Sequence, residues 1–433
     1  MKDAEMKAHV KLPSQLAAAT LGNAVEWYDF SLYAFLAPII AKNFFPTHNS
    51  EKSLLLTFGV FALGFLARPI GAVLFGHIGD KFGRRLALLL TTCCMTLATI
   101  ALGLLPTYQS VGVLAPILLL LVRLFQGLTV SGELSGSSTF LLEHAHRRHW
   151  GFAGSLITAS VYAGQLLGAI VGFTLTSLIS KAMLVNWAWR LPFLLAVILG
   201  VVVFVLRWRS TETPSFEKEQ RASHLANAPV SEAFRHYKLG MVHIFGILII
   251  AAVAGYMLVG FLPSFLIVQM GFSYHFAFLV TLFGQFLVLI SLPIVGSLSD
   301  AFGRRIFLLI GTIGFIVLSI PIFWLFSSYW LSLVLFAEML FALLMACING
   351  VVTVTMAEMF PTVVRYTGIG IAYNIALAVF GSTAPLIAEY VVNYFHSQYA
   401  VSLYLGICGI LSLPFIMRVP RLRLMGSVEE MSA

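Results

Sequence analysis

Charged residues are scarce in this chain. Only 10% of its 433 residues are Asp, Glu, Lys or Arg, whereas soluble domains carry roughly 25%. Hydrophobic residues make up 59% of the sequence, and they gather in long apolar stretches. The shortage of charge excludes an ordinary soluble domain and indicates a membrane protein. The alternating pattern of a membrane barrel is absent as well, so we expect the spans to be α-helices.

Cysteine is also rare, and the motifs of familiar enzymes are missing. The four cysteines, Cys93, Cys94, Cys347 and Cys408, fall in apolar stretches at no metal-ligand spacing, so we expect them to pack in the core. The sequence has no His/Cys cluster, nucleophile elbow or phosphate loop. We therefore expect no metal, no cofactor and no enzymatic activity. A cleavable signal peptide is not expected either, because the first apolar segment is long and contains Glu26 and Asp29.

Twelve apolar stretches predict an all-α membrane protein with twelve transmembrane helices. One long polar stretch, 207–238, interrupts them and predicts a cytoplasmic linker between two six-helix halves. The expected domains are 1–206, the linker 207–238, and 239–433 with a short cytoplasmic tail. The twelve spans are expected near residues 15–41, 53–75, 86–105, 112–142, 151–180, 187–206, 239–269, 273–297, 306–327, 329–358, 366–395 and 399–417.

The net charge of +8 follows the positive-inside rule. If the first eleven residues are cytoplasmic and the spans alternate, 20 of the 26 Lys and Arg residues lie in cytoplasmic segments, Arg207 and Arg365 among them. The excess charge thus reflects topology, with both termini cytoplasmic, and no nucleic-acid partner is expected. The other six are Lys42, Lys52 and Lys181 outside and Arg68, Arg123 and Arg190 within spans.

The two halves repeat each other. Gly76-His-Ile-Gly-Asp-Lys-Phe-Gly-Arg-Arg85 is matched 220 residues later by Gly296-Ser-Leu-Ser-Asp-Ala-Phe-Gly-Arg-Arg305, and Glu143 is matched by Glu358 at an offset of 215. Repeated halves imply a pseudo-twofold axis and a central cavity, which suits alternating access. The repeated loop predicts a cytoplasmic gate that ties two helix ends; a turn that only sets topology is the alternative. The predicted gating residues are Asp80, Arg84, Arg85, Asp300, Arg304 and Arg305.

These residues resemble the major facilitator superfamily, and within it the metabolite:proton symporters. Further matching motifs run in order along nearly the whole chain: Gly22-Asn23 with Glu26-Trp27-Tyr28-Asp29-Phe30, Arg68-Pro69-Ile70-Gly71, Arg123 with Gln126-Gly127, Trp187-Ala-Trp-Arg190, Glu212-Thr-Pro-Ser-Phe216 and Glu358-Met-Phe-Pro361 with Arg365. The resemblance implies a monomeric transporter of the bacterial inner membrane. Its family members carry citrate, 2-oxoglutarate, shikimate, or proline with betaine together with protons.

Charges inside spans are the candidate coupling residues. A carboxylate within hydrocarbon needs a partner, water or a proton, and a buried arginine needs an anion. Because the resemblance places the first and fourth helices beside the cavity, we expect Arg123 to pair with Glu26 or Asp29. The hypothesis is that Asp29 carries the coupled proton and Arg123 alternates between it and the substrate; a static ion pair is the alternative. Glu26 shares a helix face with Asn23 and Tyr33, and it is a candidate both for proton coupling and for contact with substrate.

Other embedded charges receive weaker assignments. Glu133 is expected in an inner network, as a second proton stop or simply packed among Gly132, Ser135 and Gly136. Arg68 and Arg190 are interpreted as structural, reaching polar zones by snorkelling. Glu338 and Glu389 have no assigned role.

Polar residues in the spans could line a site for a small solute, although contacts between helices are the alternative for each. The candidates besides Glu26, Tyr33 and Arg123 are Tyr162, Gln165, Tyr256, Gln285, Asn349, Tyr373 and Asn374.

The sequence therefore predicts a proton-coupled symporter that imports a small polar solute, with a carboxylate favoured by Arg123. Three alternatives stay open: a proline/betaine-type symporter of zwitterions, a proton-driven exporter, and a non-transporting receptor. The expected partners are the solute, protons and the lipid bilayer.

Overall fold

The computed structural model describes residues 2–47, 50–222 and 228–420. Every regular element in these ranges is helical. Among these residues, eleven helical segments are long and apolar enough to cross a membrane. Helix α1, with 43 residues, contains the first predicted span and brings the number to twelve. The all-α prediction is confirmed. The helices are α1 (Lys2–Phe44), α2 (Ser50–Leu66), α3 (Arg68–Phe82), α4 (Arg84–Leu104), α5 (Tyr108–Val111), α6 (Leu114–Val130), α7 (Glu133–His144), α8 (Trp150–Leu178), α9 (Lys181–Asn186), α10 (Leu191–Arg209), α11 (Pro214–Arg221), α12 (Pro229–His236), α13 (Lys238–Tyr256), α14 (Leu262–Ser264), α15 (Tyr274–Phe302), α16 (Arg304–Phe326), α17 (Leu331–Glu358), α18 (Arg365–Ala376), α19 (Ala384–Phe395) and α20 (Ala400–Met417).

The predicted spans agree with these helices, but several are broken inside. The second span divides into α2 and α3 at Ala67, where Pro69 follows in the first turn of α3, and the fourth divides into α6 and α7 at Ser131. The seventh and eleventh contain π-helical segments, Met257–Phe261, Phe265–Gln269 and Leu377–Gly381. Hydropathy does not detect such breaks, because it reports only how apolar a stretch is.

The chain forms two compact units by contact. The first comprises Met1–His144, Ser160–Glu232 and Thr362–Ile371; the second comprises Ala145–Ala159, Ala233–Pro361 and Ala372–Ala433. The start of α8 thus packs within the second unit, and the start of α18 packs within the first. The domain boundaries at 206 and 239 stay a prediction. Parts of that prediction, the linker residues 223–227 and the tail 421–433, lie outside the described residues.

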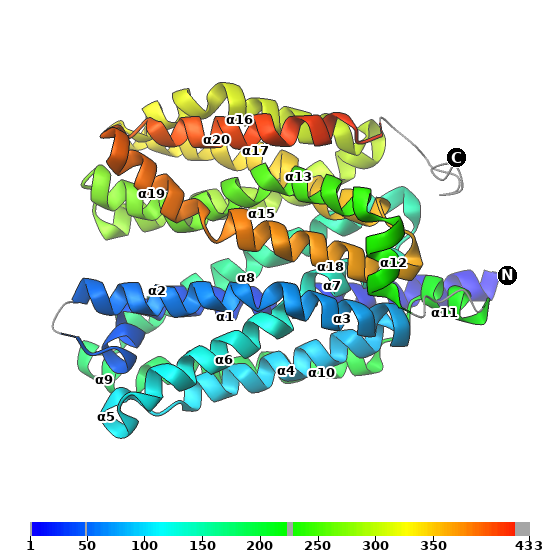
Figure 1. The fold of residues 1–433 in the computed structure, drawn as a ribbon, viewed down its shortest axis with the longest axis horizontal. Helices are drawn as coiled ribbons and strands as arrows, with labels where there is room; N and C mark the ends of the chain where they lie inside the picture. The colour runs from blue at the N-terminus through cyan, green and yellow to red at the C-terminus, as the bar shows by residue number, and fades with distance from the viewer. Residues whose placement is uncertain (1, 48–49, 223–227, 421–433) are drawn as a thin grey trace. The chain divides into compact units, whose positions relative to one another are not determined.

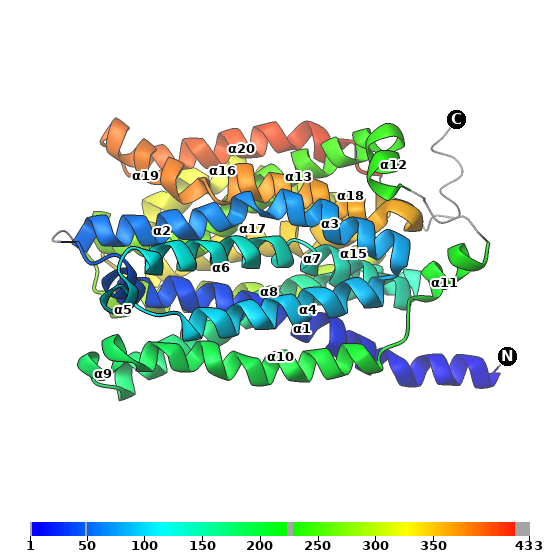
Figure 2. The same ribbon diagram turned by 60° about the horizontal axis from the view of Figure 1, so that its bottom comes forward.

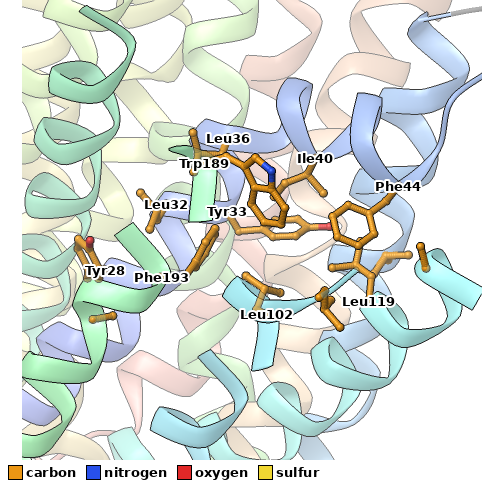
Figure 3. Close-up of a cluster of buried hydrophobic side chains, with 14 residues drawn as sticks. Tyr28, Leu32, Tyr33, Leu36, Ile40, Phe44, Leu102, Leu119, Trp189 and Phe193 are labelled. Atoms are coloured by element: carbon orange, nitrogen blue, oxygen red, sulfur yellow. The ribbon is translucent and has the colours of Figure 1, made fainter. Parts of the chain in front are cut away.

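In the first unit, α4 lies beside α10 and α6, and α1 lies against α2, α7 and α10 (Figure 1). Glycine residues allow α2 and α6 to approach each other closely. A Cβ on Gly127 of α6 would overlap the carbonyl of Gly64 in α2, so Gly127 has no room for a larger residue. The C-terminal part of α1 is held in an apolar cluster with α4, α6 and α10, in which Tyr33 lies among Leu36, Leu119 and Trp189 (Figure 3).

In the second unit, α17 packs against α15 and α16, and α20 packs against α16 and α13 (Figure 2).

The expectation that all four cysteines pack in the core is wrong. Cys408 is buried, but Cys93 is exposed on α4, because only one face of a spanning helix meets its neighbours.

Candidate functional site

Asp29 of α1 and Arg123 of α6 lie side by side in the first unit. Arg123 Nη1 is 3.7 Å from Asp29 Oδ2, and both side chains are 2% exposed. Gln126, one turn after Arg123, donates to the same Asp29 oxygen at 3.0 Å and to Thr99 Oγ1 at 3.3 Å. The structure brings the two predicted partners together, and their roles stay a prediction.

The Arg123 guanidinium rests on an aromatic ring and has unused hydrogen-bond donors. Its carbon is 3.6 Å from the centroid of the Tyr33 ring and 6.0 Å from that of Phe61. Contact with the ring face stabilises the cation by about 2 kcal/mol when water is excluded. Tyr33 is held in place by its hydroxyl, which donates to the Thr57 carbonyl at 3.1 Å. Within the described residues, Nε, Nη1 and Nη2 of Arg123 have no hydrogen-bond partner, and neither does Asp29 Oδ1. A ligand oxygen could therefore accept hydrogen bonds from these N–H groups of Arg123.

Glu26 lies one turn before Asp29 on α1 and faces a small cavity of the first unit. Its side chain is 4% exposed, and Oε2 has no hydrogen-bond partner in the described part of the chain. The cavity has a volume of about 20 Å³, enough for one water molecule. Its walls are Gly22, Val25, Thr91, Thr92, Met95, Thr96, Thr129, Val130, Glu133, Gly200, Val203 and Arg207. Glu26 and Glu133 thus share one cavity.

Glu133 of α7 forms an ion pair with Arg207 of α10. Both Arg207 Nη atoms donate to it, Nη1 at 2.9 Å to Oε2, and the hydroxyls of Thr91 and Ser137 donate at 3.0 Å. A Cβ on Gly22 would overlap the Arg207 guanidinium, which explains the glycine at this position. The expected inner network around Glu133 is present as geometry; its part in proton transfer is untested.

Arg207, which the sequence analysis places in a cytoplasmic segment, lies in the last turn of α10 and is buried in the first unit. Its side chain is 2% exposed and also donates to the carbonyls of Ala18 and Leu88, at 3.1 and 3.0 Å. The position of Arg207 in the sequence could have indicated this, because the residue directly follows the apolar run of α10 and so remains part of the helix. Sequence reasoning missed it because a basic residue at the end of a span is usually counted as topology.

Arg68 also differs from its prediction. Instead of reaching a polar zone, its side chain is 1% exposed and lies over the rings of Phe65 and Phe30, at 4.1 and 4.8 Å. Arg190 does reach polar groups: it donates to the Leu105 carbonyl at 3.1 Å and lies over the Trp189 ring. The two arginines therefore need separate explanations.

Two predicted gate residues of the first unit, Asp80 and Arg84, form a buried cluster with Glu143 and Arg365, which we call the Glu143 cluster. Arg84 is 3.1 Å from Asp80 and 3.4 Å from Glu143, and Arg365 is 2.7 Å from Glu143. Asp80 also accepts the backbone N–H groups of Tyr366 and Thr367, at 3.3 and 2.8 Å, in the first turn of α18. Carboxylates favour that position, because the first N–H groups of a helix lack internal partners.

The second unit repeats this arrangement in a more exposed form. Asp300 accepts the N–H groups of Gly151 and Phe152 at the start of α8, at 2.7 and 3.0 Å. Arg304 is 2.8 Å from Asp300 and 3.3 Å from Glu358. In both repeats the Asp thus binds a helix N-terminus as well as the Arg, which the sequence did not predict.

The second arginines of the repeated loops diverge. Arg85 donates to the carbonyls that end α10, those of Arg207 and Trp208, whereas Arg305 Nε has no hydrogen-bond partner among the described residues. Glu212, which follows α10, accepts the N–H groups of Arg84 and Arg85 at 3.1 Å each and so caps α4. Burial raises the pKa of Glu212, although these hydrogen bonds oppose the shift.

The predicted lining residues divide between the units. Tyr162 and Gln165 of α8 belong to the first unit, and both are buried. Asn349 of the second unit donates to the Met345 carbonyl one turn earlier at 3.3 Å, a bond within its own helix. Membership of a substrate site stays a prediction for all of them. The remaining residues, all in the second unit, are Tyr256 at the end of α13, Gln285 in α15, and Tyr373 and Asn374 in α18.

Long apolar helices, with a charge pair buried between two of them, define the class: this is a multi-pass membrane protein. Sequence profiles match along the chain, that of the family "Sugar (and other) transporter" over residues 15–231 and that of the "Major Facilitator Superfamily" over residues 244–427. The chain belongs to the major facilitator superfamily. The predicted family and transporter class are confirmed.

Two bacterial relatives cover most of the chain. The proline/betaine transporter of Escherichia coli is 34% identical over 412 residues, which cover 93% of this chain and 82% of that protein. The alpha-ketoglutarate permease of the same organism is 35% identical over 375 residues, 86% of each chain. Among solved structures, the proton:xylose symporter superimposes with a TM-score of 0.80 at 19% identity and covers 95% of this chain and 96% of that one. The human organic anion transporter superimposes with a TM-score of 0.69 at 16% identity, covering 94% and 99%.

Proposed function

We propose that this transporter is a proton-coupled symporter that imports a small organic solute bearing a carboxylate. It would act as a monomer in a bacterial inner membrane, with both termini cytoplasmic and no enzymatic activity. The observation that carries the proposal is the Arg123 guanidinium, which is buried on the Tyr33 ring, lies 3.7 Å from Asp29 and has N–H groups without hydrogen-bond partners among the described residues.

Arginine stays charged at any physiological pH, so Arg123 needs an anion throughout the cycle. When Asp29 is ionised, its carboxylate is that anion. When Asp29 takes up a proton, Arg123 loses its partner, and a substrate carboxylate can replace it through the unused donors. Proton binding then favours substrate binding, and by linkage substrate binding favours protonation to the same degree.

The relatives narrow the solute class. One is named for proline and betaine, which are zwitterions, and another for alpha-ketoglutarate, a dicarboxylate. The group common to these solutes is a carboxylate, which is what Arg123 would bind. A zwitterion is the second candidate, because Glu26 Oε2 is a buried carboxyl oxygen without a hydrogen-bond partner in the described chain and could accept from the cationic group of such a solute.

Energetics separate the two candidates. A proton that crosses ~100 mV gains about 2.3 kcal/mol, and one pH unit adds about 1.4 kcal/mol. A zwitterion carried with one proton therefore accumulates about 500-fold under both gradients. A monoanion carried with one proton is electroneutral, so it responds only to the pH difference, roughly tenfold per unit.

Reconstituted liposomes test the proposal. Citrate, 2-oxoglutarate, shikimate, proline and betaine are first compared in counterflow, and the solute that exchanges is followed under an imposed pH gradient. For Asp29→Asn we expect exchange to persist and uphill accumulation to be lost. Unaltered uphill transport would contradict the assigned role of Asp29. Accumulation against the imposed direction would indicate an exporter, and saturable binding without any transport would indicate a receptor.

A further inference from the structure

Glu338 of α17 is an acidic side chain that the proposed mechanism does not use. It is 0% exposed, and neither carboxyl oxygen has a hydrogen-bond partner within the described residues. It points at α15, where a Cβ on Gly284 would overlap Glu338 Oε1. The glycine thus makes room for the carboxyl group. In the sequence repeat, Glu338 corresponds to Arg123 at the offset of 215 that also relates Glu143 to Glu358.

No cation compensates this carboxyl group in the described part of the second unit. Helices α13, α15 and α16 pack against α17. Their charged groups are Lys238, Asp300, Arg304 and Arg305, and α17 itself carries Glu358. None of the three cations forms an ion pair with Glu338, and Arg304 pairs with Asp300 and Glu358 instead. At 1.5 Å per residue, Asp300 is ~24 Å along α15 from Gly284, and Glu358 is ~30 Å along α17 from Glu338. The uncharged titratable groups of these helices are His243, Tyr256 and Cys347. Tyr274 and His275 also belong to α15, but their side chains lie outside the described residues.

Charge and stability together indicate what Glu338 does. A fully buried, ionised carboxylate without a cation or hydrogen-bond donor among the described residues would be strongly disfavoured here, so the neutral acid is the form that fits this environment. Even the neutral acid is unfavourable, because a buried polar group without a hydrogen bond destabilises a fold. An apolar residue would suit the position better in this conformation. Glu338 destabilises this conformation and forms no hydrogen bond in it. Its presence is therefore explained by a function in another conformation of the transporter.

We infer that Glu338 is a second proton-carrying site of the transporter. In the conformation described here the side chain is a carboxylic acid. When α15 and α17 open to water in another conformation, the O–H bond breaks, its electron pair remains on the carboxylate oxygen, and a water molecule accepts the proton. The carboxylate takes up a proton from water before the helices close again. This inference rests on the proposed proton coupling and adds a site in the second unit to Asp29 in the first.

The test compares Glu338→Gln with Glu389→Gln, an exposed acid of α19 in the same unit. Glutamine keeps the shape of a neutral glutamic acid, so both variants are expected to fold. Infrared spectra of the purified protein should contain a carboxylic-acid carbonyl band that Glu338→Gln lacks and Glu389→Gln retains. In liposomes at zero membrane potential, Glu338→Gln should accumulate solute about tenfold less per unit of pH difference, because one proton fewer is carried. Its ratio of protons to solute should fall by one, with solute exchange preserved.

The outcomes separate this inference from the proposed function. If the wild-type protein moves no protons with its solute, the proposed function fails, and the infrared comparison still reports whether Glu338 is protonated. If the wild type is proton-driven and Glu338→Gln retains both the band and the proton ratio, the inference about Glu338 is overturned. Loss of the band with an unchanged proton ratio would also overturn it, since the proton would then be permanent.

Discussion

Replacing Glu143 by glutamine should loosen the start of α18. Glu143 accepts from Arg365 at 2.7 Å and from the Thr213 hydroxyl at 2.6 Å, and it lies 3.4 Å from Arg84. The side chains of Arg84 and Glu143 are fully buried, and that of Arg365 is 5% exposed. Glutamine keeps one acceptor oxygen but removes the charge, so two buried guanidinium groups lose an anion. Breaking a buried pair in this way typically destabilises a structure by about 3–5 kcal/mol.

Hydrogen exchange of residues 362–371 measures this loss directly. The N–H groups of Tyr366 and Thr367 donate to Asp80, so they exchange only when the segment detaches from the Glu143 cluster. If about 3 kcal/mol is lost, detachment becomes roughly 100-fold more frequent, at 1.4 kcal/mol per factor of ten. The deuterium uptake of peptides from this segment should accelerate by that factor.

Glu358→Gln is the matched control, since Glu358 occupies the equivalent place in the repeat. It is 3.3 Å from Arg304, but its side chain is 39% exposed, and exposed pairs contribute about 0–1 kcal/mol. Exchange in 145–159, whose Gly151 and Phe152 are capped by Asp300, should therefore accelerate about fivefold at most. The reasoning is refuted if Glu143→Gln accelerates exchange in 362–371 by no more than this control does in 145–159.

Two further predictions concern the loop ends. Gly83 and Gly303 have φ of 114° and 89° with ψ near 150°, a region closed to other residues, so Gly83→Ala and Gly303→Ala should each destabilise the protein by about 1–3 kcal/mol in thermal unfolding. Gly59→Ala, in open space on α2, should be neutral or stabilising; equal losses at all three positions would contradict this account. Because burial raises the pKa of Glu212, the folded protein holds its proton to higher pH than the unfolded chain does. The stability it contributes is thus complete below about pH 4.3 and is lost as pH rises through the raised pKa. Relative to Glu212→Gln, the wild type should lose stability over that range, and a constant difference between pH 4 and 8 would count against the burial argument.

Much of the fold follows from the sequence because a membrane restricts the choices. An apolar run of about 20 residues can only be a spanning helix in this composition, and α16 illustrates the accuracy: predicted at 306–327, it extends from Arg304 to Phe326. The breaks at Ala67 and Ser131 and the π-helical segments were missed, because they depend on local geometry rather than on hydropathy.

Contacts between side chains were predicted where opposite charges in apolar segments require a partner. They were missed where this requirement does not apply. Arg123 was expected to pair with Glu26 or Asp29 because opposite charges in apolar segments need each other, and the structure has Asp29 beside it. Arg207 was missed because the end of a helix is compatible with either burial or exposure. The bond between Glu143 and Arg365 joins residues 222 apart in sequence, for which no local pattern exists.

The placement of Thr362–Ile371 in the first unit has a consequence for biosynthesis. The rest of that unit ends at Glu232, so residues 233–361, 129 in all, are made before its last segment. At ~5–20 residues per second this interval lasts about 6 to 26 seconds. During that time Asp80 has no α18 to cap and Glu143 has no Arg365. The first unit therefore becomes complete only after most of the second unit has been synthesised.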